Sequence, residues 1–443
     1  MANTTASAGN PPTVRQRRKI LLIVENAAYE TDPRVQNEVA ALAAAGYQVT
    51  VICPRDSRAP RVRPPEGVRV YHHWSPSADG GRGGYLLEYL AALAQELALA
   101  VWVSLRHGFR VIQGCNPPDT ICLVAAPFKL FGVRYIFDHH DAAPELYEAK
   151  YEKRGFAYRM QVALERLTYR LSDVVMATNE SYRQLAITRG HRSPDQVFVV
   201  RNAPDPRRVF PVPENPAWRF GKRFMVGYVG SMGEQDGLDL LLQVAARFKA
   251  RGRRDTHFTL VGGGRTLSQL KAAVAAAGLG DLVTFAGRLP DREMLEVLST
   301  ADICVNPDKP CRMNDISTMI KIMEYMALGK PIVQFQSTEG RVSAGEASLY
   351  ADPARGIEDF ADKIAWLLDH PEERLRMGAV GRRRLDDSLA WKFSVPHLLA
   401  AYDRAFTGHS SRPASQADGV AVGVGAGSGK TSAPHSAHES AAR

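Results

Sequence analysis

One segment, residues 314–333, combines side chains whose types and spacing could bind a phosphorylated ligand. On a helix that turns about 100° per residue, Ser317, Lys321 and Glu324 project within one narrow sector, whereas methionine and isoleucine side chains occupy the opposite one. The free N–H groups at the start of this helix, the Ser317 and Thr318 hydroxyls and the Lys321 ammonium together predict an anion site for a diphosphate. Glu324, one turn farther along, is then placed to accept hydrogen bonds from ribose hydroxyls.

The same residues fit a purely structural role equally well. Ser317 is a favoured helix N-cap residue, and Lys321 and Glu324 have the i, i+3 spacing of an ordinary surface ion pair. Because such pairs are common on helix surfaces, this segment by itself does not decide between the two interpretations.

A second polar group, Asp138-His139-His140-Asp141, follows a run of strand-forming residues and is therefore expected at the edge of a sheet. A solvated polar turn is one interpretation, and a metal site built from His139, His140 and Asp141 is another. Adjacent residues on an extended chain point to opposite sides, so a His-His pair rarely holds one ion, and the metal site is disfavoured. Judged on these residues alone, the polar turn is favoured.

Other candidates have simpler explanations. Asp32 precedes Pro33 and a periodic helix, so it is expected to be the N-cap of that helix. The segment Gly429-Lys430-Thr431 resembles the end of a phosphate loop, but Val424 stands where such a loop requires glycine, and no helix pattern follows. We therefore assign it no role.

The elements that must position these residues alternate along the chain. Short β-branched runs are separated by helical patterns, which is typical of βαβ units and a mainly parallel sheet. The first set of expected strands is 19–25, 48–53, 68–73, 110–115, 134–138, 174–177 and 197–201, and the second is 225–230, 258–261, 283–285, 303–306, 331–335 and 348–350. The sequence therefore predicts an α/β protein with two doubly wound domains, whose strand ends face a cleft that holds the ligand.

Composition shifts predict the boundaries of these domains. The two ends are rich in Ala, Ser, Gly and Pro, and a proline-punctuated stretch separates the two sets of strands. The predicted parts are a flexible tail at 1–17, a first domain at 18–204, a linker at 205–222, a second domain at 223–390, a helix at 391–407 that crosses back to the first domain, and a disordered tail at 408–443.

Charge, cysteines and hydropathy limit the function classes. Of the formal charge of +9, residues 15–19 supply four units and residues 409–443 one more. The basicity therefore lies largely in the two ends and is only a weak argument for nucleic acid, while a modest attraction to an anionic membrane surface or to phosphates stays open. The five cysteines are far apart and form no Cys-x-x-Cys pair, which favours a reduced cytoplasm. No signal peptide is recognised, and the apolar stretch 85–105 contains Glu88 and Glu96, which disfavours a membrane span. We predict a cytoplasmic protein, with the inner face of a membrane as its one alternative location.

The run Glu324-Tyr-Met-Ala-Leu-Gly-Lys-Pro-Ile-Val333 resembles the donor-binding helix of the retaining glycosyltransferases of family four. Supporting segments are 32–35, Asp138 to Asp141 with Glu145, 201–205, 227–231 and 260–264, and the resemblance covers nearly all of residues 18–407. It implies the GT-B fold, in which two Rossmann-like domains face a cleft. It also implies transfer of a sugar from a nucleotide diphosphate sugar to an acceptor hydroxyl with retention, without a metal or other cofactor.

The resemblance assigns roles to individual residues. It places Glu324 on the donor ribose, His140 on the transferred sugar, and Asp141 beside His140. The family's first motif glutamate is replaced by Ile316, with Asp315 next to it, and Ser231 stands where many members have a clamping arginine. The donor-binding residues implied are Gly230, Ser231, Arg265, Arg288, Asp315, Ser317, Thr318, Lys321 and Glu324; the catalytic ones are His140 and Asp141; and the acceptor-binding ones are Asn26 and Glu145.

The partners implied are a nucleotide-sugar donor and a glycan or lipid-linked acceptor of polysaccharide or glycolipid assembly. Two other function classes fit the same pattern of elements. A nucleotide-sugar epimerase or hydrolase needs acids and bases around the sugar, and Ile316 weakens that hypothesis. A non-catalytic nucleotide-sugar-binding protein is the second alternative, because the clamping cations of the family are missing.

Overall fold

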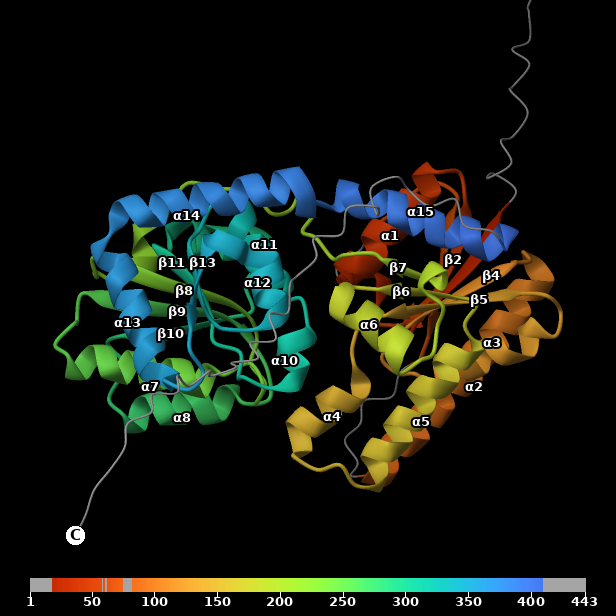
Figure 1. The fold of residues 1–443 in the computed structure, drawn as a ribbon, viewed down its shortest axis with the longest axis horizontal. Coiled ribbons are helices and arrows are strands. Elements are labelled where there is room, and N and C mark those ends of the chain that lie inside the picture. The colour runs from red at the N-terminus through yellow and green to blue at the C-terminus, as the bar shows by residue number, and fades with distance from the viewer. Residues whose placement is uncertain (1–17, 58, 60–61, 75–81, 409–443) are drawn as a thin grey trace, which may run out of the picture. The chain divides into compact units, whose positions relative to one another are not determined.

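A computed structural model of the protein describes residues 18–57, 59, 62–74 and 82–408 (Figure 1). Apart from Gly408, the two end segments predicted to be unstructured lie outside the described residues, and so does Gly429-Lys430-Thr431. The strands form two parallel sheets, as the alternation of elements predicted.

The first sheet has the strand order β3-β2-β1-β4-β5-β6-β7. Its strands are β1 (Lys19–Val24), β2 (Gln48–Pro54), β3 (Val68–His73), β4 (Val111–Cys115), β5 (Arg134–His139), β6 (Val174–Ala177) and β7 (Val197–Val199). Strand β1 pairs with β2 on one side and with β4 on the other, so the winding direction reverses beside β1. Ligands of doubly wound sheets bind at the carboxyl ends of strands near such a reversal.

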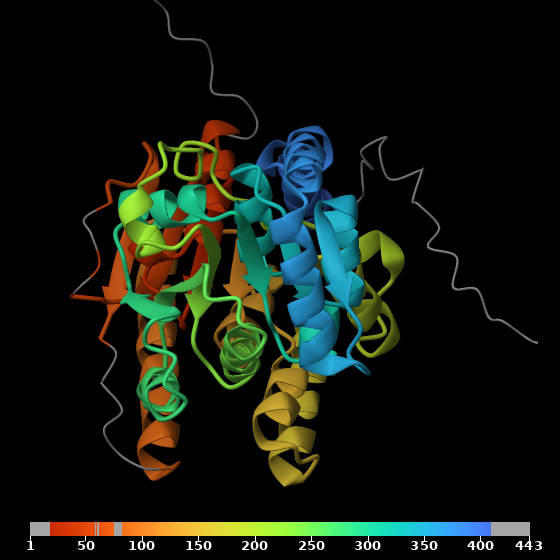
Figure 2. The ribbon, with the colours of Figure 1, turned by 90° about the vertical axis from the view of Figure 1, so that its left-hand side faces the viewer.

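The second sheet has the order β10-β9-β8-β11-β12-β13. Its strands are β8 (Phe224–Ser231), β9 (Thr256–Gly263), β10 (Val283–Gly287), β11 (Ile303–Asn306), β12 (Ile332–Phe335) and β13 (Ser348–Ala351). Here the reversal lies beside β8, which pairs with β9 and β11. Helices cover both faces of this sheet (Figure 2).

Helices connect the strands of each sheet. Those of the first half are α1 (Pro33–Ala44), α2 (Arg82–Arg106), α3 (Ile121–Lys129), α4 (Ala143–Tyr151), α5 (Phe156–Leu171) and α6 (Glu180–Thr188). Those of the second half are α7 (Leu238–Ala250), α8 (Leu267–Ala276), α9 (Asp291–Thr300), α10 (Arg312–Ile316), α11 (Ile320–Ala327), α12 (Thr338–Ala344), α13 (Gly356–Asp369), α14 (Pro371–Arg384) and α15 (Trp391–Thr407). Within the described residues, no helix is both long enough and apolar enough to cross a membrane.

The core of the first sheet explains two sequence patterns. Strand β1 is almost fully apolar because helices bury both of its faces. The expected N-cap is confirmed, since the Asp32 carboxylate accepts a hydrogen bond from the Val35 N–H at 3.1 Å. Helix α15, although it is the last helix of the described residues, packs Leu398 and Tyr402 into this core beside α1.

Candidate functional site

The segment that was expected to form one donor helix is broken. Helix α10 ends at Ile316, Ser317 is extended, and α11 begins only at Ile320. The Ser317 hydroxyl donates to the Met313 carbonyl at 2.7 Å, which closes α10 instead of starting the next helix. The prediction that Ser317 and Thr318 flank the first amides of a helix and form an anion site there is therefore wrong.

Contacts with α6 of the first half hold this break in place. Asn179 donates from its side-chain amide to the Ile316 carbonyl at 2.9 Å and to the Thr318 hydroxyl at 3.0 Å. The Tyr182 hydroxyl lies 3.0 Å from the Ser317 hydroxyl. The Ser317 and Thr318 side chains thus join the two halves of the chain at the approach to α11.

Lys321 lies in the second half, where it is buried and paired. Its ammonium is 2.8 Å from an Asp308 carboxylate oxygen and 5.0 Å from the centre of the Tyr228 ring. Burial alone would lower the pKa of Lys321, but Asp308 and Tyr228 together raise it above its ordinary value. Lys321 is therefore a permanent buried cation, and the prediction that its head lies in an open cleft is wrong.

Glu324 carries a carboxylate with no hydrogen bond or ion pair inside the described part of the chain, although it is partly buried. Burial raises its pKa to about 7; Arg208 acts in the opposite direction, and Asp291 adds to the rise. The alternative ion pair between Lys321 and Glu324 is not formed, because Lys321 pairs with Asp308 instead. Glu324 is left as an acceptor that a ligand hydroxyl can use.

Cations and glycines lie at the carboxyl ends of β8 to β10. Ser231 is exposed at the end of β8, Arg265 follows β9, and Arg288 follows β10. Arg265 forms an ion pair with Glu234 at 3.6 Å, and this pair is weak because both side chains are exposed. Arg288 has no ion pair among the described residues. Both arginines are available to an anion at this edge.

Two glycines allow the backbone to close up at this edge. Gly262 has a φ of +132°, and a side chain there would meet the Gly230 carbonyl at 1.9 Å. A side chain at Gly230 would meet the Tyr228 hydroxyl at 2.8 Å and approach Lys321 at 3.7 Å. Gly230 is thus the residue that separates the strand edge from the buried lysine.

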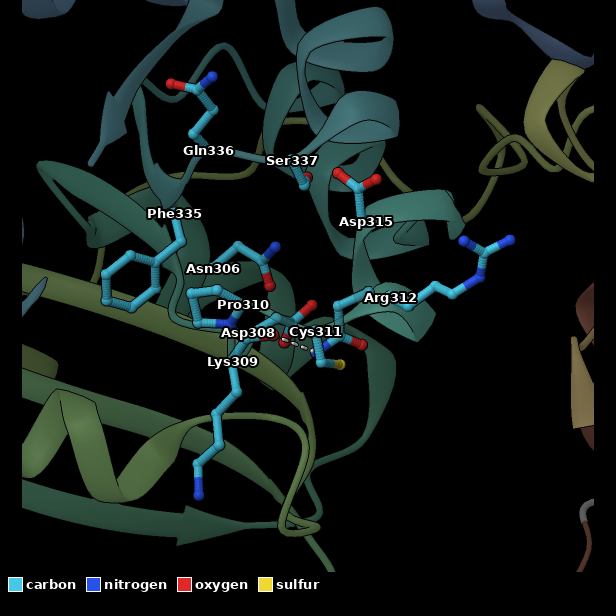
Figure 3. Close-up of a pocket in the computed structure, with 11 residues that line it drawn as sticks. Asn306, Asp308, Lys309, Pro310, Cys311, Arg312, Asp315, Phe335, Gln336 and Ser337 are labelled. Atoms are coloured by element: carbon cyan, nitrogen blue, oxygen red, sulfur yellow. Dashed lines mark hydrogen bonds between the residues drawn. The ribbon is translucent and has the colours of Figure 1, made fainter. Parts of the chain in front are cut away.

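A cavity of about 430 Å³ opens at the carboxyl ends of β11 and β12 (Figure 3). Asn306, Asp308 and Phe335 form part of its wall. Within the described residues, one oxygen each of Asn306 and Asp308 is buried without a hydrogen-bond partner. Asp315 also lines the cavity, but it accepts hydrogen bonds from the Thr338 amide and hydroxyl and so holds the start of α12.

His140 is held by hydrogen bonds to neighbouring residues of the fold rather than by solvent. Its Nε2 is 2.6 Å from Asp138, and the Asn116 side chain accepts from the His140 and Asp141 amides. Burial would lower the pKa of His140, but Asp138 raises it, and the net shift is upward. Burial raises the pKa of Asp141, while His140 opposes that rise. A solvated turn therefore does not describe this group.

A metal does not fit the group either. The ligand atoms of Cys115, Asp138 and His140 lie within 4.8 Å of one another. However, the Arg34 guanidinium is 2.6 Å from Asp138 and already supplies the positive charge. His139 is fully buried with its pKa lowered to about 3, chiefly by burial, and it is not part of this cluster.

The two residues predicted to bind the acceptor differ in their surroundings. Asn26 is exposed just after β1. Glu145 is buried, and Arg189 donates to both of its carboxylate oxygens at 2.6 and 3.1 Å, with Arg312 of the second half at 3.4 Å. Its oxygens are occupied by arginines, so the structure does not support Glu145 as an acceptor ligand.

Three charged residues beside the predicted site were not identified from the sequence. Arg34, Glu38 and Asp308 are all buried and make ion pairs next to the predicted site. The sequence pattern could have revealed two of them, because Arg34, Glu38 and the buried Leu42 follow one another at intervals of four residues on α1. Charges along an apolar helix face indicate a buried polar network.

Comparisons with known proteins agree with this architecture. The family model "Glycosyl transferase 4-like domain" matches residues 31–203, and "Glycosyl transferases group 1" matches residues 223–370. An alpha-D-kanosaminyltransferase of Streptomyces kanamyceticus is 30% identical over 320 residues, which cover 72% of this chain and 72% of that protein. A 2-deoxystreptamine glucosyltransferase of the same organism is 26% identical and covers 71% and 82% of the two chains.

Solved structures give the same fold. A sucrose-phosphate synthase from Thermosynechococcus elongatus superposes with a TM-score of 0.73 at 18% identity, covering 89% of this chain and all of that one. Anabaena Alr3699/HepE, solved with UDP and glucose, gives a TM-score of 0.65 at 15% identity over 87% of this chain and 99% of that one. At such identities the likeness concerns the fold alone.

Proposed function

The chain belongs to the family-four glycosyltransferases and has the GT-B fold, and from this premise we propose that it transfers a sugar from a nucleotide diphosphate sugar to an acceptor hydroxyl with retention. The observation that carries the proposal is the partly buried Glu324 carboxylate, which has no partner within the described residues. A ribose supplies the paired hydroxyl donors that such a carboxylate lacks.

The diphosphate is assigned to the strand edge between Glu324 and the exposed arginines. Arg288 and Arg265 supply guanidinium donors that suit phosphate oxygens. Lys321 adds its positive charge from behind Gly230, and the first amides of α11 add the helix dipole. These groups stabilise the negative charge that develops on the departing nucleoside diphosphate. The acceptor oxygen bonds to the anomeric carbon from the face on which the bond to the phosphate oxygen breaks, and the hydroxyl proton passes to the departing diphosphate. No enzyme carboxylate acts as the nucleophile in this step.

One solved structure of the same fold and the names of several relatives support this choice of donor class. Alr3699/HepE has been crystallised with UDP-glucose. The named relatives transfer glucosyl, kanosaminyl and mannosyl groups. We propose a glycan or lipid-linked acceptor and catalysis without a metal ion, so that EDTA leaves the rate unchanged.

We also propose contact with an anionic membrane through the turn between α4 and α5. Tyr151, Phe156 and Met160 are exposed there, with Lys153 and Arg159 among them. Aromatic and basic side chains together favour a lipid interface. Sedimentation with vesicles that contain anionic lipid should exceed that with neutral vesicles, and Phe156→Ser should reduce it.

The proposal is tested with a panel of UDP-, GDP- and ADP-sugars, by measuring release of the nucleoside diphosphate. We expect release from at least one donor, a strong reduction in Glu324→Ala, and no change in Glu358→Ala, which removes an exposed glutamate remote from the site on α13. Isomerised sugar without diphosphate release would indicate an epimerase. Binding of a donor without turnover or hydrolysis would indicate a binding protein, and either result would overturn the proposal.

A further inference from the structure

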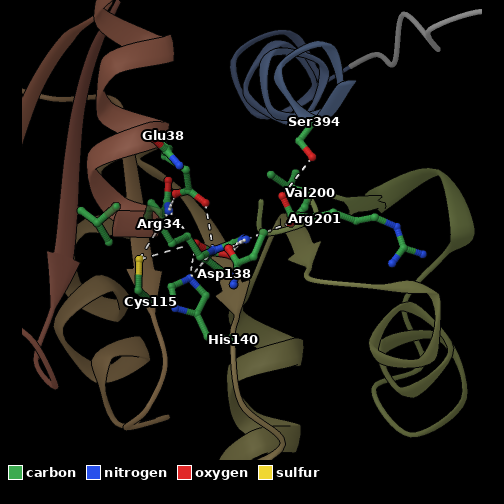
Figure 4. Close-up of polar contacts among 12 residues, drawn as sticks. Arg34, Glu38, Cys115, Asp138, His140, Val200, Arg201 and Ser394 are labelled. Carbon is green, nitrogen blue, oxygen red and sulfur yellow. Dashed lines mark hydrogen bonds and ion pairs between the residues drawn. The ribbon is translucent and has the colours of Figure 1, made fainter. Parts of the chain in front are cut away.

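A buried polar network lies behind His140 and is centred on Arg34 of α1 (Figure 4). The Arg34 guanidinium donates to Asp138 at 2.6 Å, to the Val200 carbonyl at 2.8 Å and to the Asn202 side chain at 2.7 Å. It therefore ties α1 to the ends of β5 and β7. A buried charge with several hydrogen-bond partners is held rigidly, so it also fixes the position of any further group that it contacts.

The Arg34 guanidinium also contacts the Nε2 atom of His140, and that atom has two competing partners. Arg34 Nε lies 2.8 Å from it, and an Asp138 oxygen lies 2.6 Å from it. A protonated Nε2 donates to Asp138, whereas an unprotonated Nε2 accepts from Arg34, and one nitrogen cannot do both. In the protonated state the Arg34 Nε–H loses that acceptor and keeps an ion pair with Glu38, whose Oε1 lies 3.1 Å away without a hydrogen bond.

Charge balance links the second buried acid to the same proton. Arg34 neutralises Asp138, so an ionised Glu38 needs a further cation, and His140 is the group that can supply it. A buried charge without a partner is costly. The network is therefore neutral in two states, with Glu38 ionised and His140 protonated, or with the proton on Glu38 and His140 neutral.

Hydrogen bonds on the far side of Glu38 favour its ionised form. Gln113 donates to Glu38 at 2.7 Å, and the Tyr402 hydroxyl of α15 donates to the Gln113 carbonyl oxygen. Helix α15 thus contributes to the charge at His140. Burial and the nearby Asp138 raise the pKa of Glu38, while Arg34, His140 and the hydrogen bond from Gln113 act to lower it, so the ionised form of Glu38 depends on the imidazolium of His140.

The other titratable groups around His140 do not compete for this proton near neutral pH. Burial raises the pKa of the Cys115 thiol and of the Tyr402 hydroxyl, so both stay protonated. Arg34 and His140 hold the pKa of Asp138 below its usual range although burial acts to raise it, so Asp138 stays ionised. Asp141, on the same loop, is held close to His140 and favours the imidazolium.

We propose that Arg34 and Glu38 are positioning residues for His140: Arg34 holds Asp138, which fixes the protonated imidazole at Nε2, and Glu38 provides the negative charge that keeps the ring protonated. The inference rests on the proposed function and on the family resemblance, which places His140 on the transferred sugar. An imidazolium held in this way offers its second N–H to a ligand oxygen and cannot act as a base.

The test is an NMR titration of the His140 imidazole in the full chain, assigned by comparison with His140→Gln. We expect Glu38→Gln, which keeps the size and the hydrogen bond to Gln113, to lower the pKa of His140 by about one pH unit. Glu358→Gln, which removes one negative charge far from the network, should leave it unchanged. If Glu38→Gln does not fold, Tyr402→Phe should shift the pKa in the same direction by a smaller amount.

An unchanged His140 pKa in the folded variant would overturn the inference. The pH profile of kcat separates this result from the proposed function. A shift of the profile by the same amount as the imidazole pKa would support both. A shifted imidazole with an unshifted profile would support the charge coupling and would remove His140 from the reaction.

Discussion

The buried ion pair Lys321–Asp308 has a structural role, and the proposed function gives its cation a second role. Its two side chains are 10% and 6% exposed, so both ions have left water. Such a pair contributes little net stability, but removal of one partner leaves the other charge uncompensated. The proposed function gives this cation a second use, because its charge lies behind the strand edge to which the diphosphate is assigned.

Lys321→Ala should lower the free energy of unfolding by about 3–5 kcal/mol, because Asp308 is left as an unpaired buried carboxylate. Urea denaturation measures the loss. The double variant Lys321→Ala/Asp308→Ala should recover part of it, since no buried charge is left. A single variant as stable as the parent chain would show that Asp308 is hydrated and that the lysine is not a buried cation.

Glu324 should bind the ribose only in its ionised form. Its pKa of about 7 lies above that of the unfolded chain, so ionisation costs stability as the pH rises from about 4.5 to 7. As the pH rises through this pKa of about 7, affinity for a nucleoside diphosphate should rise because the carboxylate becomes a stronger acceptor.

Calorimetric titration at about pH 6 and pH 8 measures this dependence. In Glu324→Gln the part of the pH dependence that comes from the enzyme should disappear, and Glu324→Ala should lose about 1.5–3 kcal/mol of binding. Tighter binding by Glu324→Ala would exclude the ribose role.

At the scale of elements, periodicity predicted every strand of the two sheets but missed the break between α10 and α11. Apolar runs and helix spacing follow from local sequence, and the expected strand at 303–306 matches β11. The break has its cause elsewhere in the chain, in Asn179 and Tyr182 of α6. A helical pattern read from residues 314–327 cannot contain that information.

The pairing of charges escaped prediction for the same reason. Lys321 was predicted to face Glu324 or a ligand, because these are its neighbours along a helix. Its partner, Asp308, follows β11 and reaches it only through the fold of the second sheet.

The contact between α6 and α12 predicts a link between stability and donor binding. Glu339 of α12 is buried and accepts from the amide and hydroxyl of Ser181 at 3.2 and 2.6 Å, and from Thr318 at 3.3 Å. Glu339→Ala should cost about 1–3 kcal/mol of stability and should also weaken donor binding, because residues 316–319 lose a support.

Denaturation and donor titration on the same sample measure both effects. Glu346→Ala, an exposed glutamate close by in sequence, is the control. Unaltered donor affinity in Glu339→Ala would show that the approach to α11 does not depend on this contact.

At the scale of the whole molecule, the end of the chain completes the first half. Helix α15 contributes Leu398, Ala401 and Tyr402 to the core of the first sheet, far from its neighbours in sequence. The hydrophobic core of the first sheet is therefore incomplete without α15, the last described helix.

Two truncations should consequently behave in opposite ways. A chain that lacks residues 1–17 and 409–443 should keep its thermal midpoint, because these segments have few large apolar residues. A chain that ends at Ala390 should be insoluble or unfolded, since it exposes the core that α15 covers. A large fall in the midpoint of the first truncated chain would show that an end segment packs on the fold.

The central claim, retaining transfer from a nucleotide sugar, is tested most directly by proton NMR of the reaction as it proceeds. The enzyme is incubated with the donor that the panel identifies, and the anomeric proton of the first-formed sugar product is followed together with the released nucleoside diphosphate. We expect the product to have the same anomeric configuration as the donor, and both signals to grow much more slowly in Glu324→Ala. A first-formed product of inverted configuration would contradict it.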